Sequence, residues 1–243
     1  MEAVSSPADP LQTSARGTGF KDATRVLQSP LAALEKRTLI WLAHRMPARV
    51  NSDHLTLLAF AAMIGAGLSY WLASATPIGL LLVIVCLAIN WFGDSLDGTL
   101  ARVRHQQRPR YGFYVDHVVD AAGSVFLFGG MALSGYMTPT VALVLLAAYL
   151  LISIEVYLAA YSVGTFRITH FNLGPTELRI LLAIGNLALL VHPHAMLFGR
   201  QFLLFDVGGV VATIGLLITF AVSTARNVRA LYLAEPIPRG DRA

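Results

Sequence analysis

Six long apolar stretches run through the chain, and they constrain its fold more than any other feature. They lie near residues 54–74, 77–99, 113–136, 139–163, 177–192 and 203–225, and the fifth is the shortest. A helix needs about 20 apolar residues to cross the hydrocarbon core of a bilayer. Only 13% of the residues are charged, against about 25% in a soluble domain. The sequence therefore predicts an all-α fold, a polytopic membrane helix bundle with six transmembrane helices.

A more polar helix is predicted before the first span, at residues 31–46. Its apolar residues can share much of one side: Leu31, Leu34, Leu39, Trp41 and Leu42. Charged residues lie toward another side, so the segment is too polar to span and suits a helix in the membrane interface. An ordinary amphipathic helix packed against protein is the alternative. We expect a mobile tail at 1–28 without a cleavable signal peptide, one domain at 29–230, and a C-terminal tail at 231–243.

Basic residues gather at alternate connections between the spans. Four of them lie between the second and third spans: Arg102, Arg104, Arg108 and Arg110. Because cytoplasmic loops carry an excess of Lys and Arg, both termini and this loop are expected to face the cytoplasm. Basic residues beside apolar segments favour anionic lipid headgroups over nucleic acid as partners. The single cysteine, Cys86, lies within an apolar run and is expected to be a packing residue.

Four aspartates mark the end of the second span and the start of the third. Asp94 and Asp97 are three residues apart, and Asp116 and Asp120 are four apart, so each pair lies on one helix face. A short loop brings both pairs to one depth, where four carboxylates without a cation would repel one another. Oxygen ligands of this kind suit Mg²⁺, Mn²⁺ or Ca²⁺, and no Cys or His cluster argues for zinc.

Small and basic residues accompany these acids. Gly98 follows Asp97, and Gly112 lies on the facing helix, where a missing side chain allows a ligand or backbone to come close. Arg102 lies further along the first helix as a fixed cation for phosphate. Acids, metal, small residues and arginine together indicate a site for a pyrophosphate ester.

The pattern D-x-x-D-G-x-x-A-R, nine residues, then G-x-x-x-D-x-x-x-D resembles the signature of the CDP-alcohol phosphotransferase (CDP-alcohol phosphatidyltransferase) family. All eight fixed positions are present: Asp94, Asp97, Gly98, Ala101, Arg102, Gly112, Asp116 and Asp120. The resemblance implies an enzyme that moves a substituted phosphoryl group from a CDP-linked donor to an alcohol and releases CMP. It also implies that the four aspartates hold two divalent cations, Mg²⁺ or Mn²⁺. Asp120 would in addition take the proton from the attacking hydroxyl, and the motif residues Gly98, Ala101, Arg102 and Gly112 would bind the CDP part.

Two signals near the motif keep alternatives open. Residues 51–56 resemble a family segment that lies near the nucleotide, but Asn51 or Ser52 could equally cap a helix. His117 lies between the third and fourth acids, as in the choline and ethanolamine phosphotransferases of the family. Because its neighbour Asp116 points about 100° away on a helix, packing or indirect support of the acids is expected rather than catalysis.

Two further signals lie in later spans. Residues 174–179 could shape the acceptor pocket, or they could simply start the fifth helix, with the Thr176 hydroxyl as its cap. Glu155 lies within the fourth span, where an unpaired carboxylate is costly, so it either lines the site or pairs with another helix.

The leading hypothesis is a phospholipid-synthesis enzyme with CDP-diacylglycerol as donor and a small polar alcohol as acceptor. The alternative is transfer from CDP-choline or CDP-ethanolamine to diacylglycerol, which His117 favours and the compact chain argues against. A third hypothesis, a cation transporter, needs acids along a path through the membrane, whereas these acids lie near one face. A homodimer is left open as the oligomeric state.

Overall fold

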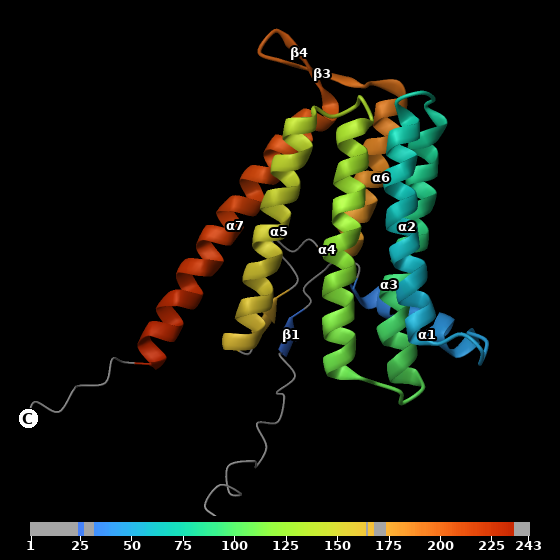
Figure 1. Cartoon of the computed structure of the whole chain (residues 1–243), viewed down its shortest axis with the longest axis vertical. Coiled ribbons are helices and arrows are strands. Elements are labelled where there is room, and N and C mark those ends of the chain that lie inside the picture. The colour runs from blue at the N-terminus through green and yellow to red at the C-terminus, as the bar shows by residue number, and fades with distance from the viewer. Residues whose placement is uncertain (1–23, 27–31, 164, 168–173, 236–243) are drawn as a thin grey trace, which may run out of the picture.

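The computed structural model describes residues 24–26, 32–163, 165–167 and 174–235 (Figure 1). Its helices are α1 (Ala32–Arg45), α2 (Ser52–Ala73), α3 (Ile78–Val103), α4 (Pro109–Leu133), α5 (Pro139–Ser162), α6 (Pro175–Val191) and α7 (Leu204–Ala234). Helices α2 to α7 run along the length of the molecule, and α1 lies at its lower end in Figure 1. The predicted tail at 1–28 lies mostly outside the described residues.

Four helices of the described part are long and apolar enough to cross a membrane: α2, α3, α5 and α7. The sequence predicted six spans. Helix α6 has only 17 residues, and the polar residues of the motif, Asp116 and Asp120 among them, lower the apolar character of α4. The chain is thus a mostly helical membrane protein. That α4 and α6 also cross the membrane stays a prediction.

Two small pairs of strands interrupt the helical pattern. Strand β1 (Thr24–Val26) pairs in parallel with β2 (Thr165–Arg167), and β3 (His194–Leu197) pairs antiparallel with β4 (Arg200–Leu203). Phe198 and Gly199, with φ of 51° and 75°, form the tight turn between β3 and β4. The predicted all-α class missed these strands, because three or four residues are too few to show an alternating pattern.

Helices α2, α3, α4 and α6 pack closely and share a core to which α5 and α7 also contribute. A Cβ atom at Gly130 of α4 would overlap the backbone carbonyl of Gly67 on α2, so the two helices cross nearly backbone to backbone. Asn186 of α6 is fully buried and donates from Nδ2 to the Tyr70 hydroxyl of α2 at 2.8 Å. These contacts join α2 to α4 and to α6 in the half of the bundle away from the motif.

Helix α1 divides its apolar residues between two environments. Leu39 and Ala43 are buried in a cluster with Leu96 of α3, whereas Leu34 and Trp41 are 66% and 53% exposed. Helix α3 therefore covers only part of these apolar residues, and the position of α1 in the membrane interface stays a prediction. Leu31 lies outside the described residues.

Helices α5 and α7 form a second pair in which Glu155 is buried. Its Oε1 accepts hydrogen bonds from Ser223 Oγ at 2.8 Å and from Asn227 Nδ2 at 2.7 Å, both on α7. Of the two alternatives for Glu155, pairing with another helix is thus the one observed.

Candidate functional site

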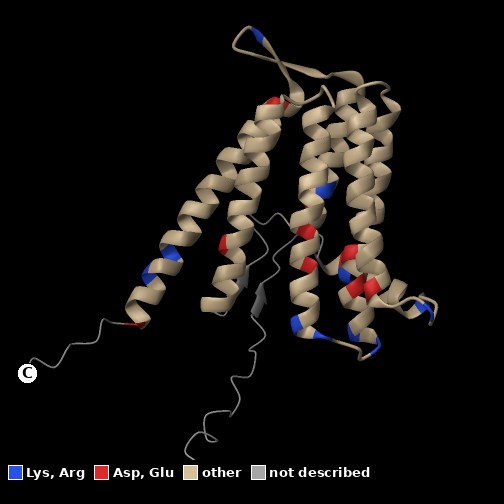
Figure 2. Ribbon diagram, viewed as in Figure 1, with Lys and Arg blue, Asp and Glu red and all other residues tan. Residues whose placement is uncertain are grey.

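The motif occupies the end of α3 and the first half of α4. Asp94, Asp97, Gly98, Ala101 and Arg102 lie on α3 shortly before it ends at Val103. Helix α4 begins at Pro109, whose missing N–H costs nothing at a helix start, and carries the other three. Figure 2 shows acidic residues gathered on these two helices, with basic residues around the connection below them.

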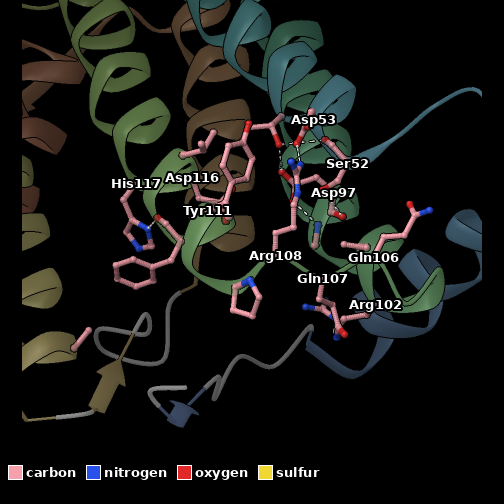
Figure 3. A pocket seen from close by; sticks show the side chains of 18 of the residues that line it. Ser52, Asp53, Asp97, Arg102, Gln106, Gln107, Arg108, Tyr111, Asp116 and His117 are labelled. Carbon is pink, nitrogen blue, oxygen red and sulfur yellow. Dashed lines mark hydrogen bonds and ion pairs between the residues drawn. The ribbon is translucent and has the colours of Figure 1, made fainter. Parts of the chain in front are cut away.

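A cavity of about 510 Å³ opens at this end of the bundle. Six of the eight motif residues line it: Asp97, Gly98, Ala101, Arg102, Gly112 and Asp116. In Figure 3, Asp116 and His117 come from α4 on one side, and Asp97 and Ser52 lie opposite. Asp94 and Asp120 are not among the lining residues, since each lies further along its helix, away from the connecting loop.

The two motif glycines are not required by packing within the protein. A Cβ atom at Gly112 would meet nothing within 4 Å, and one at Gly98 would lie 3.5 Å from Arg102 Nη1, an ordinary contact. This differs from Gly67 and Gly130, where a methyl group would strike backbone. The space that Gly98 and Gly112 leave open thus belongs to the cavity and is available to a ligand.

The start of α2 forms another part of the wall and binds the motif directly. Thr56 Oγ1 donates to Asp97 Oδ2 at 2.6 Å, and Ser52 Oγ donates to the backbone carbonyl of Asp97 at 3.0 Å. Asn51 Oδ1 accepts from the His54 backbone N–H at 3.0 Å and so caps α2. The capping alternative for Asn51 is confirmed, while Ser52, Asp53 and Thr56 line the cavity.

An ion pair lies at the rim of the cavity. Arg108 Nη2 donates to Asp53 Oδ1, and its guanidinium lies over the Tyr111 ring, 4.1 Å from the ring centre. The hydrogen bond that Arg108 donates to Asp53 raises the pKa of the Arg108 guanidinium above its usual value. Both side chains of the pair are well exposed, so an anionic ligand could replace Asp53 at little cost.

Arg179 of α6 reaches the motif from a distant part of the chain. Its Nη2 donates to Asp94 Oδ2 at 2.6 Å, and its Nε donates to Asn90 Oδ1 at 2.8 Å. The third nitrogen, Nη1, is buried with no hydrogen-bond partner among the described residues. Asn90 was not among the predicted site residues, although a polar residue inside an apolar span is a signal that could have found it.

The start of α6 is capped differently from the prediction. Gly174 is the N-cap residue, and its backbone N–H donates to Glu177 Oε2 at 3.0 Å. The Thr176 hydroxyl donates instead to Glu35 of α1. The predicted capping role of Thr176 is therefore wrong, because a tertiary contact has taken its hydroxyl.

The four aspartates lie close enough to influence one another electrostatically. The carboxyl of Asp120 interacts with the charges of Asp94, Asp97, Asp116 and Arg179. Within the described residues, however, no three His, Cys, Asp or Glu side chains are gathered around a single point that could hold a metal ion. Asp94 is held by Arg179 and Asp97 by Thr56. The oxygen-only chemistry of the set fits a hard divalent cation, which would compete with these two partners.

His117 lines the cavity as part of an aromatic group. Its Nδ1 contacts the Phe113 carbonyl oxygen, and its ring meets the edge of Tyr157 of α5 with centroids 4.3 Å apart. These contacts are those of a packed side chain, in line with the role expected for it.

The sequence of the chain matches a known family over most of its length. Residues 50–224 match the CDP-alcohol phosphatidyltransferase family, and the chain belongs to it. The family comprises phosphotransferases that use CDP-alcohol donors and generally depend on divalent metal ions. The chain is also similar to "Inner membrane protein YnbA" of Escherichia coli (strain K12), with 27% identity over 197 residues, 81% of this chain and 91% of that protein.

Proposed function

We propose that this protein is a membrane enzyme of phospholipid synthesis. It transfers the phosphatidyl group of CDP-diacylglycerol to a small polar alcohol and releases CMP. The observation that carries this proposal is the cavity in which six of the eight family motif residues meet, between α2, α3 and α4. Its volume of about 510 Å³ is within the range of small-molecule sites.

The cavity is suited to the CDP part of the donor. Gly98 and Gly112 leave room for a ligand close to the backbone, and Arg102 and Arg108 supply positive charge for phosphate oxygens. The diphosphate would then lie between Asp97 and Asp116, with the cytidine toward the start of α2.

The metal ions required by the family would be held by Asp94, Asp97, Asp116 and Asp120. When bound, Mg²⁺ or Mn²⁺ would supply positive charge at the attacking and leaving oxygens. For this, the carboxylates of Asp94 and Asp97 would have to turn from Arg179 and Thr56, or share an oxygen with them. Each aspartate has two oxygens, so sharing is possible without breaking either bond.

The reacting alcohol would approach at Asp120. This residue lies further from the connecting loop than the cavity-lining residues of α4, and its carboxyl interacts with the charges of Asp94 and Arg179. Asp120 would accept the hydroxyl proton while the alcohol oxygen attacks the phosphorus that bears the diacylglycerol. The bond from this phosphorus to the bridging oxygen breaks, and CMP leaves with that oxygen. The unpartnered Arg179 Nη1 would donate to an oxygen of the transferred phosphoryl group.

The proposed membrane arrangement has six spans, α2 to α7, with α1 in the interface. The exposed Leu34 and Trp41 of α1 would face lipid while Leu39 packs on α3. The arginines of the α3–α4 connection would lie on the cytoplasmic side together with both termini. The cavity then opens toward the compartment in which CDP-linked donors and CMP are found.

The test is an assay of the purified protein with labelled CDP-diacylglycerol and a panel of alcohols, following CMP release and labelled lipid. A parallel arm supplies CDP-choline or CDP-ethanolamine with diacylglycerol. A labelled phospholipid from the first arm supports the proposal and identifies the acceptor. Product in the second arm alone would reverse the roles of donor and acceptor, and no CMP in either arm would refute the proposed reaction.

A further inference from the structure

Glu35 of α1 makes an unusual set of contacts with the two helices that carry Asp94 and Arg179. Its Oε1 accepts hydrogen bonds from Trp91 Nε1 at 2.8 Å, from Ser95 Oγ at 3.3 Å and from Thr176 Oγ1 at 2.6 Å. The first two donors are on α3 and the third is on α6. One carboxylate oxygen therefore joins three helices.

The donors to Glu35 lie next to the Asp94–Arg179 ion pair on both helices. Trp91 is three residues before Asp94, and Thr176 is three residues before Arg179, so in each case the two side chains lie on neighbouring positions of one helix face. The contact through Glu35 and the contact between Asp94 and Arg179 thus form two adjacent cross-links between α3 and α6.

The chemistry of Glu35 suits a cross-link better than a direct role in the reaction. It is not among the residues that line the cavity, and all three of its donors are neutral groups of the protein. A hydrogen bond to a charged carboxylate is roughly twice as strong as one between neutral groups. Without Glu35, the Trp91 and Thr176 donors would lose the partner they have in common.

We propose that Glu35 is a positioning residue that sets α6 against α3 so that Arg179 engages Asp94. In this way α1, which lies outside the bundle of long helices, contributes to the geometry of the site (Figure 1). The effect on turnover rests on the proposed function, whereas the effect on the α3–α6 arrangement does not.

The kinetic test compares Glu35→Ala with Glu35→Gln. Glu35→Ala should lower kcat by roughly 10- to 100-fold through misplacement of Arg179. The KM for the CDP donor should stay within about 3-fold, because Glu35 is not among the residues that line the cavity. Glu35→Gln keeps an oxygen acceptor and should restore most of kcat. Thr176→Val removes one donor only, and should lower kcat less than Glu35→Ala.

Glu155→Ala is the matched control, since Glu155 is also a glutamate that accepts hydrogen bonds from a neighbouring helix. It should lower thermal stability without the selective loss of kcat. If Glu35→Ala and Glu155→Ala lower activity only in proportion to the folded fraction, Glu35 is merely structural and the proposal is wrong.

Two readouts do not depend on activity. In a protein that also carries Trp41→Phe and Trp71→Phe, Trp91 is the remaining tryptophan. Its fluorescence emission should change when Glu35→Ala is added, and much less when Glu35→Gln is added. Spin labels at the exposed positions Leu57 of α2 and Leu178 of α6, with Cys86 replaced, should give a broader or displaced distance distribution in Glu35→Ala. An unchanged distance distribution in Glu35→Ala overturns the proposal. This readout applies even if the wild-type protein is inactive with every CDP donor and the proposed function fails.

Discussion

Arg179 and Asp94 form an ion pair of 2.6 Å between Nη2 and Oδ2, although they lie 85 positions apart in the chain. The pair is largely shielded, with 16% and 30% of the two side chains exposed. The Nη1 nitrogen of Arg179 is buried and has no hydrogen-bond partner in the part of the chain that the structure describes. A donor in this state lacks a hydrogen bond that a ligand oxygen could supply.

Arg179→Lys is expected to lower turnover by on the order of 100-fold. A lysine ammonium is a single point charge and cannot reach Asn90, Asp94 and the unpartnered position at once. CMP release by the purified variant measures the effect. Arg200→Lys, the same change in β4 at the opposite end of the bundle, is the control and should behave as the wild type. Equal activity of both variants would rule out a special role for Arg179.

Removal of divalent metal should abolish turnover, and Mg²⁺ or Mn²⁺ should restore it, because the converging carboxylates need a counter-charge. Binding of Mn²⁺, followed by its electron paramagnetic resonance signal, should weaken in Asp116→Asn. It should not weaken in Asp206→Asn, since Asp206 bonds Thr138 at the other end of the bundle. Full activity in excess EDTA would contradict the metal-dependent mechanism.

Asp120→Asn should abolish turnover while leaving much of the CDP-donor affinity in place, because Asp120 does not line the cavity. Asp97→Asn should weaken donor binding as well, since Asp97 lines the cavity and bonds Thr56 of α2. Donor binding can be measured by isothermal calorimetry in the presence of metal. A loss of affinity of the same size in both variants would deny Asp120 its role as the base.

Gly130→Ala should destabilise the bundle by roughly 1–3 kcal/mol through overpacking. The added methyl group would overlap the Gly67 carbonyl and push α4 away from α2. The neighbouring Gly129 provides the control, because a Cβ atom there meets nothing within 4 Å. Gly129→Ala should be neutral or stabilising by up to about 1 kcal/mol from helix propensity. Thermal unfolding in detergent distinguishes them, and a similar shift in both would argue against the close crossing.

The topology can be tested with single cysteines in a background without Cys86. Gln106 lies in the exposed α3–α4 connection, among the arginines expected to face the cytoplasm. Gln106→Cys should react with a membrane-impermeant thiol reagent only after cells are opened. Phe198→Cys, at the fully exposed tip of the β3–β4 hairpin at the other end of the bundle, should react in intact cells. The reverse pattern would place the cavity on the wrong side for its donor.

Local features of the sequence were sufficient to predict the long helices and to identify the motif. Each of the six apolar stretches overlaps one helix from α2 to α7 and extends past its ends by at most three residues, because apolar length and helix-breaking connections are properties of neighbouring residues. The spacing of Asp94, Asp97, Asp116 and Asp120 likewise predicted two acidic faces near one loop. The family inferred from the motif is confirmed by the match over residues 50–224.

Only the tertiary structure decided which distant side chains meet these acids. Glu35 and Thr176 are 141 positions apart and bond each other because α1 and α6 both pack near α3. In the same way, Thr56 meets Asp97 because α2 lies along α3. Hydrophobic periodicity shows which face of a helix is buried, but not which helix covers it. The partners of the motif therefore depend on the packing of the bundle, and no local pattern in the sequence encodes them.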